Sequence, residues 1–198
     1  RIWITLIVLC TMTPLSAQEK TLSPVNATIV NNVSANANLI KAVNQTIWGY
    51  AEVGLEETRS SALLQQHLKN AGFKVKGGLS KMPTAFIAEY GSGKPIIGVL
   101  AEYDALPGLS QKIADHQTPL KEGANGHGCG HSGLGAGALG AALAIKEAID
   151  EHQVKGTIRL YGTPAEETVI GKVYMTLDGV FDDLDLCLHW HPGDKNNT

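Results

Sequence analysis

The stretch PIIGVLAEYD, residues 95–104, is the part of the chain that says most about the fold. It is apolar without interruption from Pro95 to Ala101, as expected of a strand in a sheet that is covered on both faces. It then becomes polar at Glu102 and Asp104. Other apolar strand-like runs alternate with helical patterns along the chain, which predicts an α/β sheet whose functional site lies at the carboxyl ends of its strands.

Hydrophobic periodicity predicts the elements around this stretch. Apolar residues at helical spacing predict helices over residues 39–50, 57–70 and 133–149. Short apolar runs predict further strands over residues 84–90, 157–161 and 184–189. The turn signal Gly-Ser-Gly-Lys at residues 91–94 predicts a hairpin between the strands that flank it.

The N-terminal residues form a separate segment. Arg1 precedes an apolar stretch from Ile2 to Cys10 and a Leu-Ser-Ala sequence that ends at Ala17, the layout of a secretory signal peptide. A buried N-terminal helix or strand is the alternative. We expect residues 1–17 to be removed from an exported protein, periplasmic or secreted, and residues 18–37, rich in Asn, Ser, Thr and Ala, to be a mobile leader.

Composition is that of a folded domain. The 198 residues are 43% hydrophobic and 18% charged, which is normal for a globular core. A net charge of −3 provides no basic surface for nucleic acid. We expect neither a nucleic-acid partner nor a membrane association once the signal is removed.

Three clusters of metal-ligand residue types occur in the second half of the chain. The first is GHGCGH, residues 126–131, in which Cys129 and His131 are close enough in a glycine-rich loop to face one ion. The second is the pair Glu166 and Glu167, and the third is the sequence LHWHP at residues 188–192. Thiolate, imidazole and carboxylate groups are the ligands that Zn²⁺ and similar ions select.

The carboxylates near these clusters suggest separate roles. In the pair Glu166 and Glu167, one can bind metal while the other takes a proton from metal-bound water. Asp104 is either a turn residue or the carboxylate that orients a ligand imidazole. Glu102 is either a ligand or the polar end of its strand, and Cys129 could instead form a disulfide with Cys187.

A glycine pattern resembles a nucleotide-binding motif. Residues 135–140 fit G-x-G-x-x-G, but the residues before them are not a strand, and the glycines fall within a predicted helix. We expect them to permit close helix packing.

Four blocks, in order, carry a family resemblance: GVLAEYDALPG at 98–108, GHGCGH at 126–131, GTPAEE at 162–167 and LHWHPG at 188–193. From residue 38 onward the chain resembles the metal-dependent amidohydrolases that include aminoacylases and indole-acetyl-amino-acid hydrolases. It is most similar to the B type of p-aminobenzoyl-glutamate utilisation hydrolases. The resemblance implies a zinc-peptidase-like catalytic domain with a mixed sheet flanked by helices, of which residues 38–198 are the N-terminal part.

The resemblance also implies roles. Cys129, His131 and Glu167 match metal ligands, Glu166 matches the general base and Asp104 matches the supporting carboxylate. His189 matches a further ligand, with His191 as the alternative. Family members hold two divalent ions, for which we expect zinc, with manganese, cobalt or nickel as alternatives. They are about twice this length, with a dimerisation domain and one more His ligand beyond Thr198, so we expect a homodimer at full length and an inactive isolated chain.

The sequence therefore predicts a hydrolase of an amide bond in an N-acyl or aminobenzoyl amino acid or a small peptide. Metal-activated water would attack the amide, with a Glu as general base. The alternatives are a metal-binding domain without catalysis and a nucleotide-binding module at residues 133–140.

Overall fold

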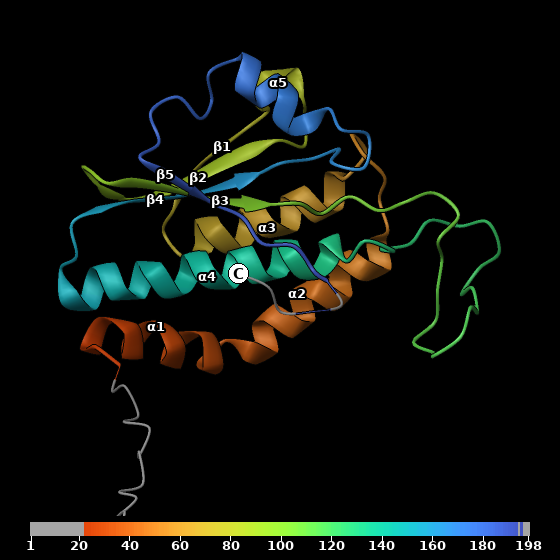
Figure 1. The fold of residues 1–198 in the computed structure, drawn as a ribbon, viewed down its shortest axis with the longest axis horizontal. Coiled ribbons are helices and arrows are strands. Elements are labelled where there is room, and N and C mark those ends of the chain that lie inside the picture. Colours follow the sequence, from red (N-terminus) through yellow and green to blue (C-terminus); the bar gives the residue numbers. More distant parts are fainter. Residues whose placement is uncertain (1–21, 194, 196–198) are drawn as a thin grey trace, which may run out of the picture.

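The computed structural model describes residues 22–193 and residue 195. The expected signal peptide, residues 1–17, lies outside this part. Figure 1 shows a central sheet with a layer of helices on one face and a smaller cover on the other. Among the described residues, no helix is both long and apolar enough to span a membrane.

The sheet has five strands in the order β1-β2-β4-β3-β5. They are β1 (Lys74–Gly77), β2 (Phe86–Ser92), β3 (Ile96–Ala101), β4 (Gly156–Gly162) and β5 (Leu186–Leu188). The inner strand β4 runs parallel to β3 and antiparallel to β2, and β5 runs parallel to β3. The predicted mixed sheet flanked by helices is confirmed.

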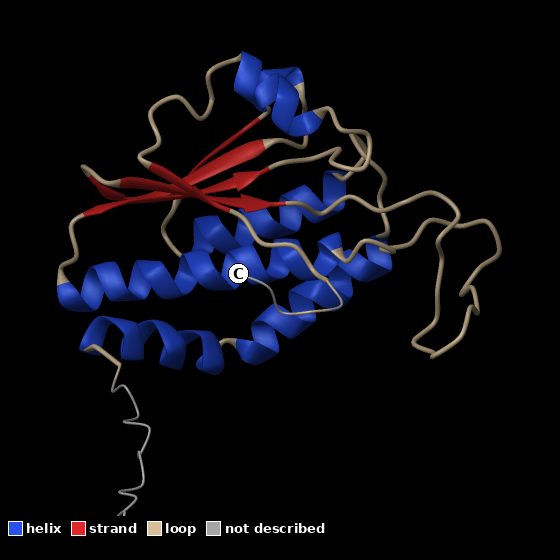
Figure 2. Ribbon diagram, in the orientation of Figure 1, coloured by secondary structure: helices blue, strands red, loops and turns tan. Residues whose placement is uncertain are grey.

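Helices cover the sheet unequally. One face carries α1 (Pro24–Ala35), α2 (Ala37–Tyr50), α3 (Thr58–Asn70) and α4 (His131–His152), while the other carries α5 (Gly171–Leu177) and the short 3-10 helix η1 (Leu79–Lys81) (Figure 2). The larger core joins Ile47, Leu64 and Leu139 on the helices to Phe86 and Leu160 on the sheet. Burial of these apolar side chains is the main force that holds the two layers together.

The predicted hairpin at residues 91–94 is wrong. β2 and β3 are antiparallel in direction, but β4 lies between them and bonds to both. Two strand spacings amount to about 10 Å, which the few residues between Ser92 and Ile96 can span. β4 is buried along nearly its whole length, so the position with a neighbour on either side suits it.

The expected mobile leader, residues 18–37, is also corrected, because the helix α1 (Pro24–Ala35) takes up more than half of it. Pro24 occupies the first turn, and Ser23 caps the helix by accepting a bond of 3.2 Å from the Asn26 amide. The helix α1 packs against α4, and at this contact Thr28 Oγ1 lies 2.8 Å from His152 Nε2. None of the residues of α1 is fully buried, which explains why hydrophobic periodicity did not predict this helix.

The G-x-G-x-x-G pattern lies inside α4, from the fifth residue of the helix onward. A Cβ atom on Gly135 would stand 2.8 Å from the Glu102 carbonyl oxygen, and one on Gly140 would stand 2.5 Å from Ile40 Cδ1. These glycines allow α4 to approach β3 and α2 closely, as the sequence predicted. They do not form the turn between strand and helix that holds a dinucleotide phosphate.

The packing role of Gly135 can be measured against Gly133 as a matched control. Gly133→Ala should stabilise the protein by up to about 1 kcal/mol, because alanine favours the helix and its Cβ would have only an ordinary contact, 3.8 Å from Asn44. Gly135→Ala should lower the free energy of unfolding, because overpacking against backbone costs about 1–3 kcal/mol. Chemical denaturation measures both, and stabilisation by both variants would contradict the packing assignment.

Candidate metal centre at the carboxyl edge of the sheet

The topology brings the predicted clusters to one edge. Because β3, β4 and β5 are parallel, their carboxyl ends lie together, and the chain leaves them at Glu102, Thr163 and His189. α4 begins at the same edge with His131, directly after the glycine-rich loop (Figure 1). Residues from distant parts of the sequence therefore line one site.

His131 is the buried centre of this site. Its Nδ1 donates to Asp104 Oδ1 at 2.9 Å, and both side chains are fully buried. The second oxygen of Asp104 accepts from the Glu167 amide at 2.9 Å. Asp104 therefore holds both the imidazole ring and the turn after β4, as the orienting carboxylate predicted from sequence would.

The free nitrogen of His131 faces two carboxylates. Its Nε2 lies 3.1 Å from Glu102 Oε2 and 3.7 Å from Glu166 Oε2. Neither close contact has the geometry of a hydrogen bond, and Nε2 and Glu102 Oε2 are buried without a partner among the described residues. Oε1 of Glu167 is buried and unpartnered as well. Unpaired buried polar atoms are costly, so the facing atoms His131 Nε2 and Glu102 Oε2 fit a position for a cation.

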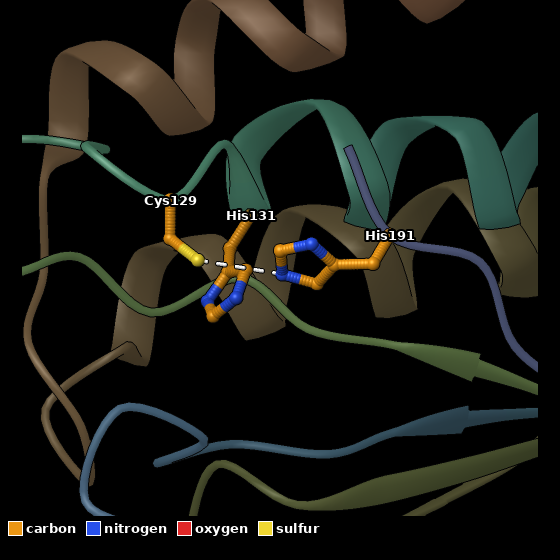
Figure 3. Close-up of side chains that lie close together, drawn as sticks. All are labelled: Cys129, His131 and His191. Atoms are coloured by element: carbon orange, nitrogen blue, oxygen red, sulfur yellow. Dashed lines mark hydrogen bonds between the residues drawn. The ribbon is translucent and has the colours of Figure 1, made fainter. Parts of the chain in front are cut away.

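A second group meets on the open side of His131. Cys129 Sγ lies 3.3 Å from His191 Nε2, and the rings of His131 and His191 stand edge to face with their centres 5.6 Å apart (Figure 3). His191 Nδ1 donates to the Pro192 carbonyl at 2.9 Å, which leaves the Nε2 lone pair facing the thiol. The side chains of all three come within ligand distance of one another.

His189, the ligand favoured by the family resemblance, lies beside Glu102 instead. Its Nε2 is 3.1 Å from Glu102 Oε1, the same oxygen that Lys172 of α5 contacts. Glu102 therefore lies at the site. From sequence alone, its position at a strand end was compatible either with a ligand or with the polar end of the strand. Lys172 was missed, because no pattern distinguishes a single lysine in a short helix.

The cluster carries excess negative charge. Burial, together with the nearby carboxylates of Glu167, Glu166 and Glu102, raises the pKa of the Cys129 thiol to about 11. Burial also raises the pKa of Glu167, with Asp104 and Glu166 adding to the rise and His131 opposing it. A bound cation would reverse these effects, because it stabilises a thiolate and a carboxylate together.

The donor set fits divalent metal. Two groups of three side chains could each hold an ion, because the ligand atoms within each group lie within 4.8 Å of one another. One group is Cys129, His131 and His191, and the other is Glu102, His131 and Glu166. Imidazole, thiolate and carboxylate donors match zinc chemistry, and the hydrogen bond from His131 to Asp104 fixes the ring as ligand histidines require. The alternative of a disulfide is not seen, because Cys129 and Cys187 are both free thiols.

Other histidines of the described region have separate roles. His116 is exposed and pairs with Asp115, and His152 lies at the contact between α1 and α4. His127 donates to the Ile47 carbonyl at 3.1 Å and so ties the glycine-rich loop to α2. Cys129, His131, Glu166, Glu167, Asp104 and both histidines of the last motif all meet at one edge.

The chain is similar in sequence to known proteins. The sequence model of peptidase family M20/M25/M40 matches residues 98–198. The chain is 44% identical over 161 residues to the B component of p-aminobenzoyl-glutamate hydrolase from Escherichia coli (strain K12), covering 81% of this chain and 34% of that protein. It is 34% identical over 163 residues to IAA-amino acid hydrolase ILR1-like 6 of Arabidopsis thaliana, covering 79% of this chain and 34% of that one.

Solved structures agree on the fold. A dinuclear metal-binding peptidase of the M20 family from Bacillus subtilis superposes with a TM-score of 0.64 at 22% identity, covering 85% of this chain and 44% of that one. The fold and the site together define the class of metallopeptidase catalytic domains. Within that class, the chain belongs to peptidase family M20/M25/M40. It spans about a third of the length of the two curated relatives.

Proposed function

We propose that the protein containing this chain is a metal-dependent amidohydrolase that cleaves an N-acyl or aminobenzoyl amino acid. The observation that supports it most is that the unpartnered buried atoms of Glu102 and His131 face each other, while His131 also lies within ligand distance of Cys129 and His191. The two curated relatives are named as hydrolases of a p-aminobenzoyl-glutamate and of an IAA-amino acid, which supports an amide substrate that carries an amino acid.

Cys129, His131, Glu167 and His191 are the residues that would hold the metal, with Glu102 facing the same imidazole. The dinuclear site of the Bacillus subtilis peptidase supports two ions, and the thiolate and imidazole donors favour zinc. A bound divalent ion polarises a carbonyl and lowers the pKa of water.

Glu166 is suited to carry protons in this reaction. Its side chain is 34% exposed, against 16% for Glu167 and 1% for Glu102, so it is the most accessible of the three carboxylates. Its Oε2 lies 3.7 Å from His131 Nε2 and therefore borders the proposed metal position. From there the carboxylate can take a proton from the attacking water and later deliver it to the leaving amine.

The proposed activity is tested on the whole protein. After chelation it should not hydrolyse p-aminobenzoyl-glutamate or N-acetyl amino acids, and addition of zinc, manganese, cobalt or nickel should restore hydrolysis of at least one of them. Restored metal binding without hydrolysis of any substrate would favour a metal-binding domain. Hydrolysis that survives complete chelation would contradict the proposal outright.

The two histidines of the last motif should differ in metal binding. His191→Ala should lower zinc affinity strongly, because its Nε2 faces Cys129 and its loss would leave a proposed zinc ion short of one ligand. His189→Ala should have a much smaller effect, because that ring contacts Glu102 and not the thiol. Competition with a fluorescent zinc chelator measures both affinities, and a larger loss in His189→Ala would assign the ligand role to His189.

A further inference from the structure

The turn that carries Glu166 is held by two buried carboxylates, one on each side. The amide before it, at Ala165, donates to Glu57 Oε1 at 2.8 Å. The amide after it, at Glu167, donates to Asp104 Oδ2 at 2.9 Å. Glu57 is fully buried and Asp104 is 1% exposed, so neither bond is shared with bulk water.

Glu57 is itself fixed from behind. Its second oxygen accepts from Thr84 Oγ1 at 2.9 Å. The Thr84 carbonyl accepts from the hydroxyls of Tyr103 and Ser61, each at 2.7 Å. Thr84 and Tyr103 are buried, and Tyr103 stands between Glu102 and Asp104 in the sequence. A chain of hydrogen bonds therefore connects the start of α3 with the end of β3 and with the turn after β4.

The turn needs this support because its backbone is strained. Ala165 has a φ of +56°, in the left-handed region that disfavours residues with a Cβ, and it is fully buried. A Cβ on Gly54 would stand 3.0 Å from Ala165 Cα, so the neighbouring segment packs directly against the turn. Such a conformation persists only where the surroundings determine it, and the bond to Glu57 is the direct restraint on the Ala165 amide.

We propose that Glu57 is a positioning residue for the reaction: it holds the Ala165 amide so that the Glu166 carboxylate borders the metal position. Its role parallels that of Asp104, which holds the amide on the other side of Glu166 and also His131. The inference rests on the proposed function for its effect on catalysis, whereas its effect on the turn can be measured without any activity.

Replacement of Glu57 should act on turnover more than on binding. Displacement of a catalytic group by about 1 Å can cost about 10²-fold in rate. We expect Glu57→Ala to lower kcat by about 10- to 100-fold with KM changed by less than about 3-fold. Glu57→Gln should retain most of kcat, since its oxygen can accept from Ala165 while its amide donates to Thr84 Oγ1.

Two further variants separate positioning from stability. Thr84→Val keeps the bond from Glu57 to Ala165 but removes its support, so an intermediate loss of kcat is expected, and it serves if Glu57→Ala does not fold. Glu52→Ala is the matched control, because Glu52 accepts from the amides of Arg59 and Ser60 at the start of the same helix and makes no bond to the turn. It should lower stability while leaving kcat within about 3-fold.

The experiment measures kcat, KM, zinc content and amide hydrogen exchange for the whole protein and its four variants. We expect the Ala165 amide to exchange at least about 10-fold faster in Glu57→Ala, with β4 amides such as Leu160 unchanged. Unchanged exchange at Ala165, or equal kcat losses in Glu57→Ala and Glu52→Ala, would overturn the inference. If the wild-type protein hydrolyses no substrate, the proposed function fails, and the exchange measurement alone decides the role of Glu57 in the turn.

Discussion

Glu166→Gln is expected to lower kcat by about 10²–10⁴-fold while metal content stays at the wild-type value. The amide has the shape of the carboxylate but cannot accept and deliver a proton at neutral pH. Glu166 is the most exposed carboxylate of the cluster, so the substitution leaves the buried ligand atoms in place. Steady-state kinetics on the zinc-loaded whole protein, with elemental analysis of the same sample, measures both quantities.

Glu167 supplies the matched control one residue away. Glu167→Gln should lower zinc affinity, because the buried Oε1 that has no hydrogen-bond partner is a proposed ligand atom. Equal loss of metal in both variants would remove the distinction between the two carboxylates. Near-normal turnover in metal-loaded Glu166→Gln would contradict the role of Glu166 as general base.

Asp104→Ala is expected to have the second large effect, because one side chain holds two parts of the site. Without it, His131 Nδ1 and the Glu167 amide both lose their acceptor inside the protein. Loss of a carboxylate that orients a ligand histidine typically costs about 10–100-fold in metal affinity. Each unsatisfied buried donor should also lower the free energy of unfolding by about 1–3 kcal/mol.

Zinc competition and chemical denaturation, the latter on metal-free protein, measure the two effects of Asp104→Ala separately. Asp115→Ala is a suitable control, since that carboxylate is exposed and pairs only with His116 in the described structure. If Asp104→Ala and Asp115→Ala bind zinc with equal affinity, then metal binding by His131 does not depend on its hydrogen bond to Asp104.

The residues that meet at the site could be predicted from the sequence better than the order of the strands in the sheet. The end of β3, the end of β4 and the glycine-rich loop could be brought together from sequence, because parallel strands place their carboxyl ends at one edge. The hairpin at residues 91–94 failed for the opposite reason. Its turn signal is local, whereas the insertion of β4 between β2 and β3 depends on a strand much further along the chain.

Long-range contacts also explain the site residues that were missed. Glu57 acts on a turn 108 positions away, and Lys172 reaches Glu102 across 70 positions. No spacing rule links such residues, because their proximity exists only in the folded sheet. His191 illustrates a third case, since the path of the chain after β5 decides which of two histidines in LHWHP faces Cys129.

Some predictions stay untested. The signal peptide at residues 1–17, export of the protein and a homodimer at full length stay predictions. So does the assignment of residues 38–198 as the first part of a catalytic domain with one more His ligand to follow. N-terminal sequencing of the mature protein would test the signal peptide, and size-exclusion chromatography with light scattering of the whole protein would test the homodimer.

The central claim is that the carboxyl edge of the sheet binds metal through Cys129 and the surrounding imidazoles and carboxylates. X-ray absorption spectroscopy of bound zinc tests this claim most directly. The zinc-loaded whole protein should show a sulfur shell at about 2.3 Å together with nitrogen or oxygen at about 2.0–2.2 Å. The sulfur shell should disappear in Cys129→Ala and persist in Cys187→Ala, whose thiol is exposed on β5. Zinc surrounded only by nitrogen and oxygen in the wild-type protein, or a sulfur shell that survives in Cys129→Ala, would contradict the account.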